Sequence, residues 1–182
     1  FKSKDSNKSQ QDRCMMYLAA SSGSGKSYFV NQYCELYDGL HNGKNTIYFL
    51  TMNDYKADRS LNQSIYKFVN VPKFLEHYAD EKNMRDFETS SEFNNSMFVF
   101  DDIGSLTGEN EKTMWGIINI ILEFKRKNLI SAIIISHIPT LGHLTKLLIR
   151  EIKNYVIFPA NLQVKSDRLL KNYLGLSNDQ LN

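Results

Sequence analysis

Residues 20–27 read ASSGSGKS and have the residue types of a loop that wraps phosphate groups. In such a loop the backbone N–H groups surround the phosphates, a lysine reaches their outer oxygens, and a serine or threonine hydroxyl binds magnesium. The glycine that usually opens the pattern is replaced by Ala20. A strand is expected to end there, and the later glycines still let the backbone approach a phosphate, so we expect the replacement to be tolerated.

The residues of this P-loop have distinct expected roles. Gly23 and Gly25 form the turn, Lys26 binds the phosphates and acts in catalysis, and Ser27 is a magnesium ligand. The N-K-x-D motif that reads guanine in GTPases is absent from the sequence, which favours ATP as the nucleotide. The expected nucleotide-binding residues are Ser22, Gly23, Ser24, Gly25, Lys26, Ser27 and Tyr28.

Two aspartates follow the apolar run SMFVF at residues 96–100. An acid at the end of a strand that lies beside a P-loop holds the magnesium ion, which is the expected role of Asp101. Asp102 has the position of a general base that polarises the attacking water, with a loop or helix cap as the alternative. The doubled acid favours ATP hydrolysis over phosphate transfer to a small molecule.

A histidine ends the apolar run at residues 130–136. In P-loop ATPases that have an additional strand between the two motif strands, a polar residue at the end of that strand lies beside the γ-phosphate and senses hydrolysis. Ser136 and His137 occupy that place, and His137 is the expected sensor. The alternative is an ordinary hydrogen-bonded turn residue.

Two arginines are candidates for completing the site of a neighbouring subunit. Arg126 lies in the basic turn FKRKN, and Arg150 lies near the final apolar run. An arginine supplied across a subunit interface can raise the hydrolysis rate by about 10³ to 10⁵. The alternative for each is a solvated cation at a helix end, which the helix dipole favours.

The elements that must position these residues follow from the spacing of apolar residues. Strands are expected at residues 14–20, 45–50, 96–100, 130–136 and 154–158, and helices at residues 26–37 and 111–127. The runs are apolar throughout, which is typical of strands covered on both faces. Strands alternating with helices predict an α/β three-layer P-loop NTPase sandwich, with a mainly parallel sheet of the additional-strand ATPase type.

The middle of the chain has the weakest pattern. Its apolar residues suggest a helix broken near Pro72, and residues 88–95 are expected to be a loop. The apolar residues behind that expectation are Tyr66, Phe68, Val71, Phe74, Leu75 and Tyr78.

Composition limits the class of protein. The chain has 182 residues, a formal net charge of +2 and 42% hydrophobic residues, as expected for one globular domain. We expect a flexible segment at residues 1–12 and the ATPase domain at residues 13–182. Cys14 and Cys34 are expected to be buried free thiols, and no apolar run approaches the ~20 residues of a membrane span.

Positive charge is concentrated in one part of the sequence. Residues 125–153 include six lysines and arginines but only one acidic residue, Glu151. This pattern fits either a DNA-contacting surface or a solvated face.

The chain resembles the genome-packaging ATPases of poxviruses and other large DNA viruses, a branch of the FtsK-HerA group. The matching segments are ASSGSGKS, FVFDD, NLISAIIISH with its preceding basic turn, and the tail LIREIKNYVIFPA followed by LLKNYLGLS. The resemblance extends from Arg13 onward. His137 stands where the family commonly has glutamine, and Arg126-Lys127 stands where it usually has Arg-His.

This resemblance implies a motor that hydrolyses ATP with Mg²⁺ and pulls double-stranded DNA into a capsid. It further implies a homo-oligomeric ring, a pentamer or hexamer, with capsid or membrane-associated viral packaging components as partners. The implied location is the viral assembly site in the host cytoplasm, with the virion as a further location. Two alternatives stay open: a P-loop assembly or switch ATPase that acts on protein partners, and a nucleotide kinase.

Overall fold

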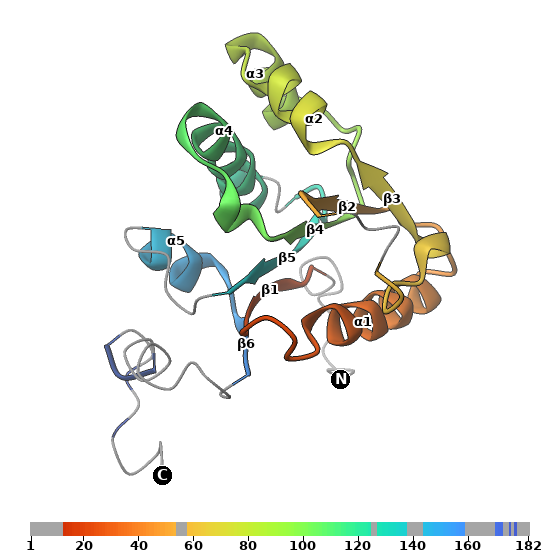
Figure 1. The fold of residues 1–182 in the computed structure, drawn as a ribbon. Helices are drawn as coiled ribbons and strands as arrows, with labels where there is room; N and C mark the ends of the chain where they lie inside the picture. The colour runs from red at the N-terminus through yellow and green to blue at the C-terminus, as the bar shows by residue number, and fades with distance from the viewer. Residues whose placement is uncertain are drawn as a thin grey trace, which may run out of the picture.

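One six-stranded sheet forms the centre of the computed structural model (Figure 1). The structure describes residues 13–53, 58–124, 127–137, 144–158, 170–172, 175 and 177, without the side chains of residues 144–147. The strands are β1 (Met15–Ala19), β2 (Ile47–Thr51), β3 (Tyr66–Val69), β4 (Met97–Asp101), β5 (Ser131–Ser136) and β6 (Asn154–Ile157). Their order is β3-β2-β4-β5-β1-β6, and each described pairing is parallel.

Helices cover both faces of this sheet. They are α1 (Lys26–Leu40), α2 (Val71–Tyr78), α3 (Glu81–Thr89), α4 (Gly108–Asn119) and α5 (Leu144–Glu151). Shorter turns are the 3-10 helices Gln63–Ile65 and Ile103–Ser105 and the π-helix Ile120–Phe124, which continues α4. Figure 1 shows α1 on one side of the sheet and the other helices on the opposite side. This arrangement confirms the expected α/β three-layer sandwich.

Both faces of the central strands are buried, which explains why their sequences do not alternate with polar residues. In β1, Met15 and Tyr17 belong to the apolar cluster that includes residues of α2 to α5. Met16 and Leu18 belong to the second cluster, with α1. Because successive side chains of a strand point to opposite faces, a strand with helices on both sides must be apolar throughout.

The additional strand lies where the sequence predicts it. β5 pairs with β1 on one side, with Leu18 opposite Ile135, and with β4 on the other, with Phe100 opposite Ile134. Because these strands are parallel, their carboxyl ends meet at one edge of the sheet, where α/β proteins bind ligands.

The middle of the chain differs from the expectation of one broken helix. Residues 66–69 form the strand β3, in which Tyr66 and Phe68 pair beside β2. Asn70 then caps α2 by accepting a hydrogen bond from the Lys73 backbone, and Pro72 lies in the first turn of that helix. Proline needs no hydrogen-bond partner there, so it begins a helix instead of interrupting one.

Two other boundaries also differ. α3 extends to Thr89, inside the segment 88–95 that was expected to be a loop. The helix expected at residues 111–127 begins earlier, at Gly108, and changes from α to π geometry after Asn119.

Neither cysteine forms a disulfide. Both are free thiols as predicted; Cys34 is buried as expected, whereas Cys14 is only half-buried. Within the part of the chain that the structure describes, no helix is both long and apolar enough to span a bilayer.

Candidate active site

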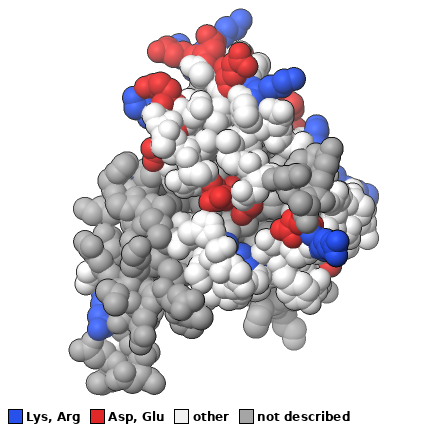
Figure 2. Space-filling model, viewed as in Figure 1, with Lys and Arg blue, Asp and Glu red and all other residues white. Residues whose placement is uncertain are grey.

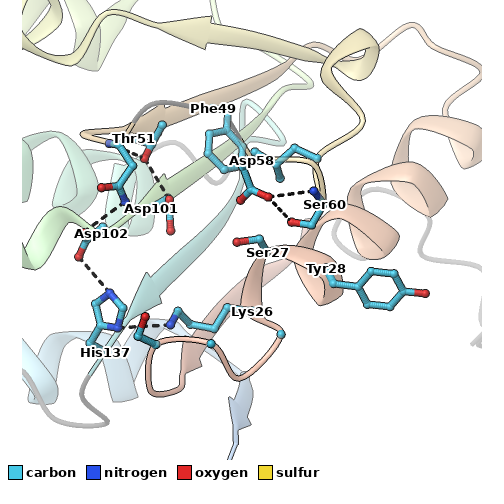
Figure 3. A pocket seen from close by; sticks show the side chains of 15 residues that line it. Lys26, Ser27, Tyr28, Phe49, Thr51, Asp58, Ser60, Asp101, Asp102 and His137 are labelled. Carbon is cyan, nitrogen blue, oxygen red and sulfur yellow. Dashed lines mark hydrogen bonds and ion pairs between the residues drawn. The ribbon is translucent and has the colours of Figure 1, made fainter. Parts of the chain in front are cut away.

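A cavity of about 530 Å³ opens at the carboxyl edge of the sheet (Figure 3). Its volume lies within the range of small-molecule sites. The P-loop, the ends of β2, β4 and β5, and the turn before Leu61 supply its walls. The lining residues are Ser22, Gly23, Gly25, Lys26, Ser27, Tyr28, Phe49, Thr51, Asn53, Asp58, Ser60, Leu61, Asp101, Asp102 and His137.

The P-loop has the backbone form that its glycines permit. Gly23 has φ 74° and Gly25 has φ 90°, and Gly25 is the N-cap of α1. The Lys26 ammonium donates hydrogen bonds to the carbonyls of Ala20 at 3.1 Å and Ser21 at 2.8 Å. The start of a fifteen-residue helix and a lysine thus meet at one place, which suits a polyphosphate.

Three other residues that were expected to bind the nucleotide differ in their surroundings. Ser24 is absent from the cavity wall, because its hydroxyl donates to the Ser21 carbonyl at 2.7 Å inside the loop. Tyr28 is 63% exposed, and its ring points away from the loop (Figure 3). Ser22 lines the cavity.

Ala20 has a structural explanation. Its side chain is fully buried, and its backbone N–H donates to the Ser136 carbonyl at 3.0 Å, so it extends the pairing of β1 with β5. Its φ is not positive, so this position needs no glycine.

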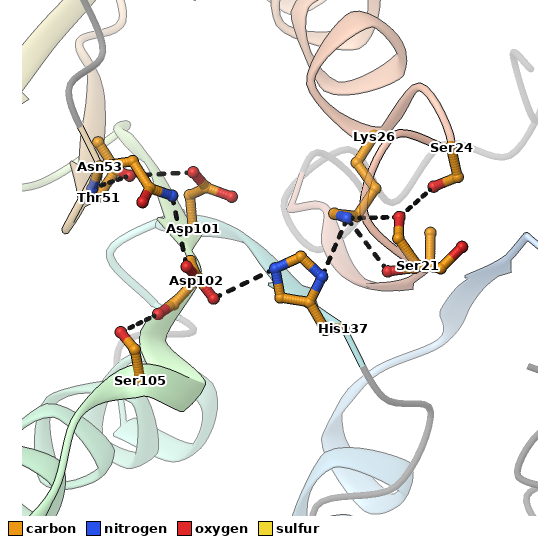
Figure 4. Close-up of polar contacts among 10 residues, drawn as sticks. Ser21, Ser24, Lys26, Thr51, Asn53, Asp101, Asp102, Ser105 and His137 are labelled. Atoms are coloured by element: carbon orange, nitrogen blue, oxygen red, sulfur yellow. Dashed lines mark hydrogen bonds and ion pairs between the residues drawn. The ribbon is translucent and has the colours of Figure 1, made fainter.

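His137 bridges the P-loop and the acidic pair (Figure 4). Its Nδ1 lies 3.3 Å from Lys26 Nζ, and its Nε2 lies 3.3 Å from Asp102 Oδ1. Because an ammonium group can only donate, Nδ1 accepts and Nε2 carries the proton toward the carboxylate. The geometry therefore selects one neutral tautomer of His137 and links the ends of β1, β4 and β5.

Asp102 is held in a restricted backbone conformation. Its φ is 55° and ψ 32°, a left-handed form that costs a residue other than glycine about 1–3 kcal/mol. The Ser105 hydroxyl donates to its backbone carbonyl at 2.8 Å, and the Asn53 amide donates to its side chain at 3.4 Å. Strained backbone conformations cluster at functional sites in proteins, and the Asp102 carboxylate lies 3.3 Å from His137.

Asp101 lies deeper than Asp102. The Thr51 hydroxyl donates to its Oδ2 at 3.0 Å. Burial is the main cause that raises the pKa of Asp101, and the neighbouring Asp102 adds to it, while Thr51, Lys26 and His137 oppose the rise. Burial also lowers the pKa of Lys26, against the attraction of both aspartates. The site thus contains a lysine and two acids that are electrostatically coupled.

The donor set suits Mg²⁺ bound together with a nucleotide. Among the described residues, no three His, Cys, Asp or Glu side chains form a cage for a metal ion. A magnesium ion at the cavity would therefore take the Ser27 hydroxyl, phosphate oxygens and water, with Asp101 nearby. Mg²⁺ usually keeps several waters and is held by few protein groups together with substrate phosphates.

Of the two candidate arginines, the structure describes Arg150, and it does not line the cavity. Arg126 lies outside the described residues. Arg150 pairs with Glu123 and, at 2.7 Å, with Glu151. It precedes β6, which begins beside the start of β1, so it lies near the edge of the sheet opposite the P-loop. Arg150 therefore lies away from the P-loop cavity of its own chain.

The positive charge of the segment at residues 125–153 is partly neutralised by nearby acidic residues. Lys127, Arg150 and Lys153 line a cleft of about 810 Å³ at this opposite edge, together with Glu123 and Glu151. On the face shown in Figure 2, acidic side chains lie at the centre, and basic and acidic ones are mixed elsewhere. The described surface seen there gives the DNA hypothesis no continuous basic track.

The sequence patterns missed one wall of the cavity. Phe49, Thr51, Asn53, Asp58 and Ser60 all come from β2 or the segment after it. The polar residues that follow the expected strand at residues 45–50 are a usable signal, because all parallel strands end at the same edge. Asp58 and Ser60 lack such a signal, since several residues separate them from the strand.

Comparisons with known proteins support the fold. No protein-family model matches the chain. It is 27% identical over 172 residues to the uncharacterized protein V3 of Sputnik virophage, covering 93% of this chain and 65% of V3. It is similar to the structure of the pCW3 conjugation coupling protein TcpA, a monomer with ATPγS, with TM-score 0.52, 15% identity, and coverage of 86% of this chain and 54% of TcpA.

The chain therefore spans less than two thirds of the length of each of these proteins. The likeness to TcpA, together with the parallel sheet and the P-loop, shows that the chain has a P-loop NTPase fold.

Gly25 offers a test of the P-loop backbone. We expect Gly25→Ala to lower the free energy of unfolding by about 1–2 kcal/mol, because alanine is strained in a left-handed conformation. An added Cβ meets nothing within 4 Å at Gly25, so the cost is one of backbone conformation alone. Urea unfolding of the variant and the wild type, without nucleotide, measures this change in the free energy of unfolding.

Gly39 is the matched control. It also has open space around an added Cβ, but it lies within α1 and has no positive φ. Gly39→Ala should raise the free energy of unfolding by up to about 1 kcal/mol. Equal effects at the two glycines would contradict the described P-loop geometry.

Proposed function

We propose that this chain is the motor domain of a viral genome-packaging ATPase, which hydrolyses ATP to move double-stranded DNA into a capsid. The observation that carries the proposal is the Lys26–His137–Asp102 bridge. It joins a phosphate-binding lysine to a candidate base through the end of an additional strand. Similarity to a virophage protein and to a conjugation coupling protein supports the viral and motor parts of the proposal.

In the proposed reaction each residue of the site has its own role. Lys26 exchanges hydrogen-bond partners among Ala20, Ser21 and His137 for the β- and γ-phosphates of ATP. Asp102 accepts the proton of the attacking water, and His137 holds that carboxylate in position. Ser27 and Asp101 would hold a magnesium ion bound with ATP, which would neutralise charge on the phosphates.

The proposed assembly is a homo-oligomeric ring, a pentamer or hexamer, that acts on double-stranded DNA with capsid or membrane-associated viral packaging components. Its proposed place is the viral assembly site in the host cytoplasm, and the virion. The position of Arg150, away from its own cavity, is compatible with a role in a neighbouring subunit, and Arg126 is the other candidate.

Duplex DNA should raise the ATPase activity several-fold, because a motor couples hydrolysis to movement along DNA. Lys26→Ala should abolish nucleotide binding and turnover with and without DNA. Lys73→Ala, on the exposed side of α2, is the control and should behave as wild type. ATP hydrolysis that DNA leaves unchanged, but a protein partner raises, would favour the assembly or switch ATPase instead.

Asp102→Asn should separate binding from hydrolysis. The amide cannot accept the water's proton, so the turnover number should fall by about 100-fold or more. Asparagine tolerates the left-handed backbone, so the fold and ATP binding should persist. Binding measured by calorimetry beside steady-state turnover checks this. An equal loss of both would place Asp102 among the metal-binding groups.

Mixing inactive variants tests whether Arg126 acts across a subunit interface. Rings mixed equally from Arg126→Ala and Lys26→Ala subunits should regain up to about a quarter of wild-type turnover, because one interface in four then pairs an intact lysine with an intact arginine. The same mixture made with Arg150→Ala is the parallel experiment. Rescue with Arg150→Ala alone would assign the role to Arg150, and no rescue in either mixture would exclude both.

A further inference from the structure

A turn outside the predicted motifs is fixed against α1 beside the P-loop. The Asn62 backbone N–H donates to Asn31 Oδ1 at 2.7 Å, and the Tyr66 hydroxyl donates to the same oxygen at 3.1 Å. Asn31 is a buried residue of α1, and Leu61 is buried beside the same helix. These contacts hold the turn at residues 58–62 over the start of α1, where Ser27 lies.

Asp58 is the acidic residue of this turn. Its Oδ1 accepts hydrogen bonds from the Ser60 backbone at 2.9 Å and from the Ser60 hydroxyl at 2.6 Å. Its side chain faces Ser27 across the cavity (Figure 3). Burial would raise the pKa of Asp58, but hydrogen bonds from Ser60 and Ser27 outweigh it and hold the pKa below its usual value. The two bonds from Ser60 therefore fix the Asp58 carboxylate in the cavity wall.

Asp101 and Asp58, which line the same cavity as Ser27, have different partners. Asp101 accepts its side-chain hydrogen bond from Thr51, whereas the Asp58 carboxylate faces the Ser27 hydroxyl, which helps to hold the pKa of Asp58 down. A serine hydroxyl has one proton and two lone pairs. When its proton points to Asp58, its lone pairs point elsewhere and are free to bind a cation.

We propose that Asp58 is a positioning residue for the divalent cation of a magnesium–nucleoside triphosphate complex, acting by orienting the Ser27 hydroxyl. This inference rests on the proposed function, because it needs the cavity to bind such a complex. Carboxylates that hydrogen-bond to a metal ligand fix its orientation and increase its basicity, and their loss typically costs 10–100-fold in metal affinity. Asp58 adds to the cavity a further carboxylate, which comes from outside the P-loop and the paired aspartates.

The test measures ATPγS binding as a function of magnesium concentration. For Asp58→Asn we expect the magnesium concentration at half-maximal binding to rise about tenfold or more. Without magnesium, in chelator, ATPγS should bind this variant as tightly as wild type or more tightly, because a negative charge near the triphosphate is gone. A general loss of affinity would lower binding in both conditions.

Two further variants make the test specific. Asp86→Asn removes the same charge from the exposed surface of α3 and should keep the wild-type midpoint. Ser60→Ala removes one donor to Asp58 and should raise the midpoint by a smaller factor, about threefold. Should Asp58→Asn fail to fold, as judged by thermal unfolding, the Ser60→Ala midpoint decides.

The outcomes separate this inference from the proposed function. A wild-type midpoint in Asp58→Asn, or in Ser60→Ala where that variant decides, would overturn the role of Asp58 while wild-type ATPγS binding still supported the nucleotide site. Weaker binding in chelator as well as in magnesium would also overturn it. Absence of ATPγS binding to the wild-type chain would overturn the proposed function and this inference together.

Discussion

The pairing of β5 between β1 and β4 is the constraint on which the rest of the site depends. The Ala20 N–H bonds to the Ser136 carbonyl at one end of the β1–β5 pairing, and the Ala132 N–H bonds to the Cys14 carbonyl at the other. These backbone bonds fix the register, so the P-loop and His137 must leave the sheet side by side. A shift of one residue would turn each side chain of the strand to the opposite face. Helices bury both faces of β5, and the strand ends in polar residues. A shift would therefore be costly, because it would move these polar residues relative to the apolar surroundings.

The polar groups at this edge of the sheet influence one another's protonation states and side-chain orientations. Lys26 can only donate, so its contact with His137 selects the tautomer that presents a proton to Asp102. Burial disfavours charge on both Lys26 and Asp101, and their attraction offsets part of that cost. A polyphosphate would add negative charge beside Lys26 and favour its charged form. Among the described residues that line this cavity, Lys26 therefore lies next to two acids that a bound cation would shield.

Much of this arrangement could be predicted from local patterns, and the exceptions have physical causes. The buried strands were predictable because helices on both sides require uninterrupted apolar runs. β3 was mistaken for helix because its alternating Tyr66 and Phe68 directly precede the helical spacing of α2, and only the Asn70 cap separates them. Asp58 was not predictable at all, since the hydrogen bonds between Asn31 and the turn that carries it join distant parts of the chain.

The contacts of Lys26 suggest how nucleotide could change the edge of the sheet under the proposed function. Its ammonium has three protons, and Ala20, Ser21 and His137 are its three partners. A phosphate oxygen can therefore bind Lys26 only by replacing one of them. Replacing His137 would leave that ring, among its described contacts, with Asp102, next to the strained turn at the end of β4. A ligand shifts the equilibrium between the arrangement with Lys26 bonded to His137 and the arrangement with Lys26 bonded to phosphate only by the difference in its affinity for the two. Exchange of a neutral imidazole for an anionic phosphate favours the second arrangement.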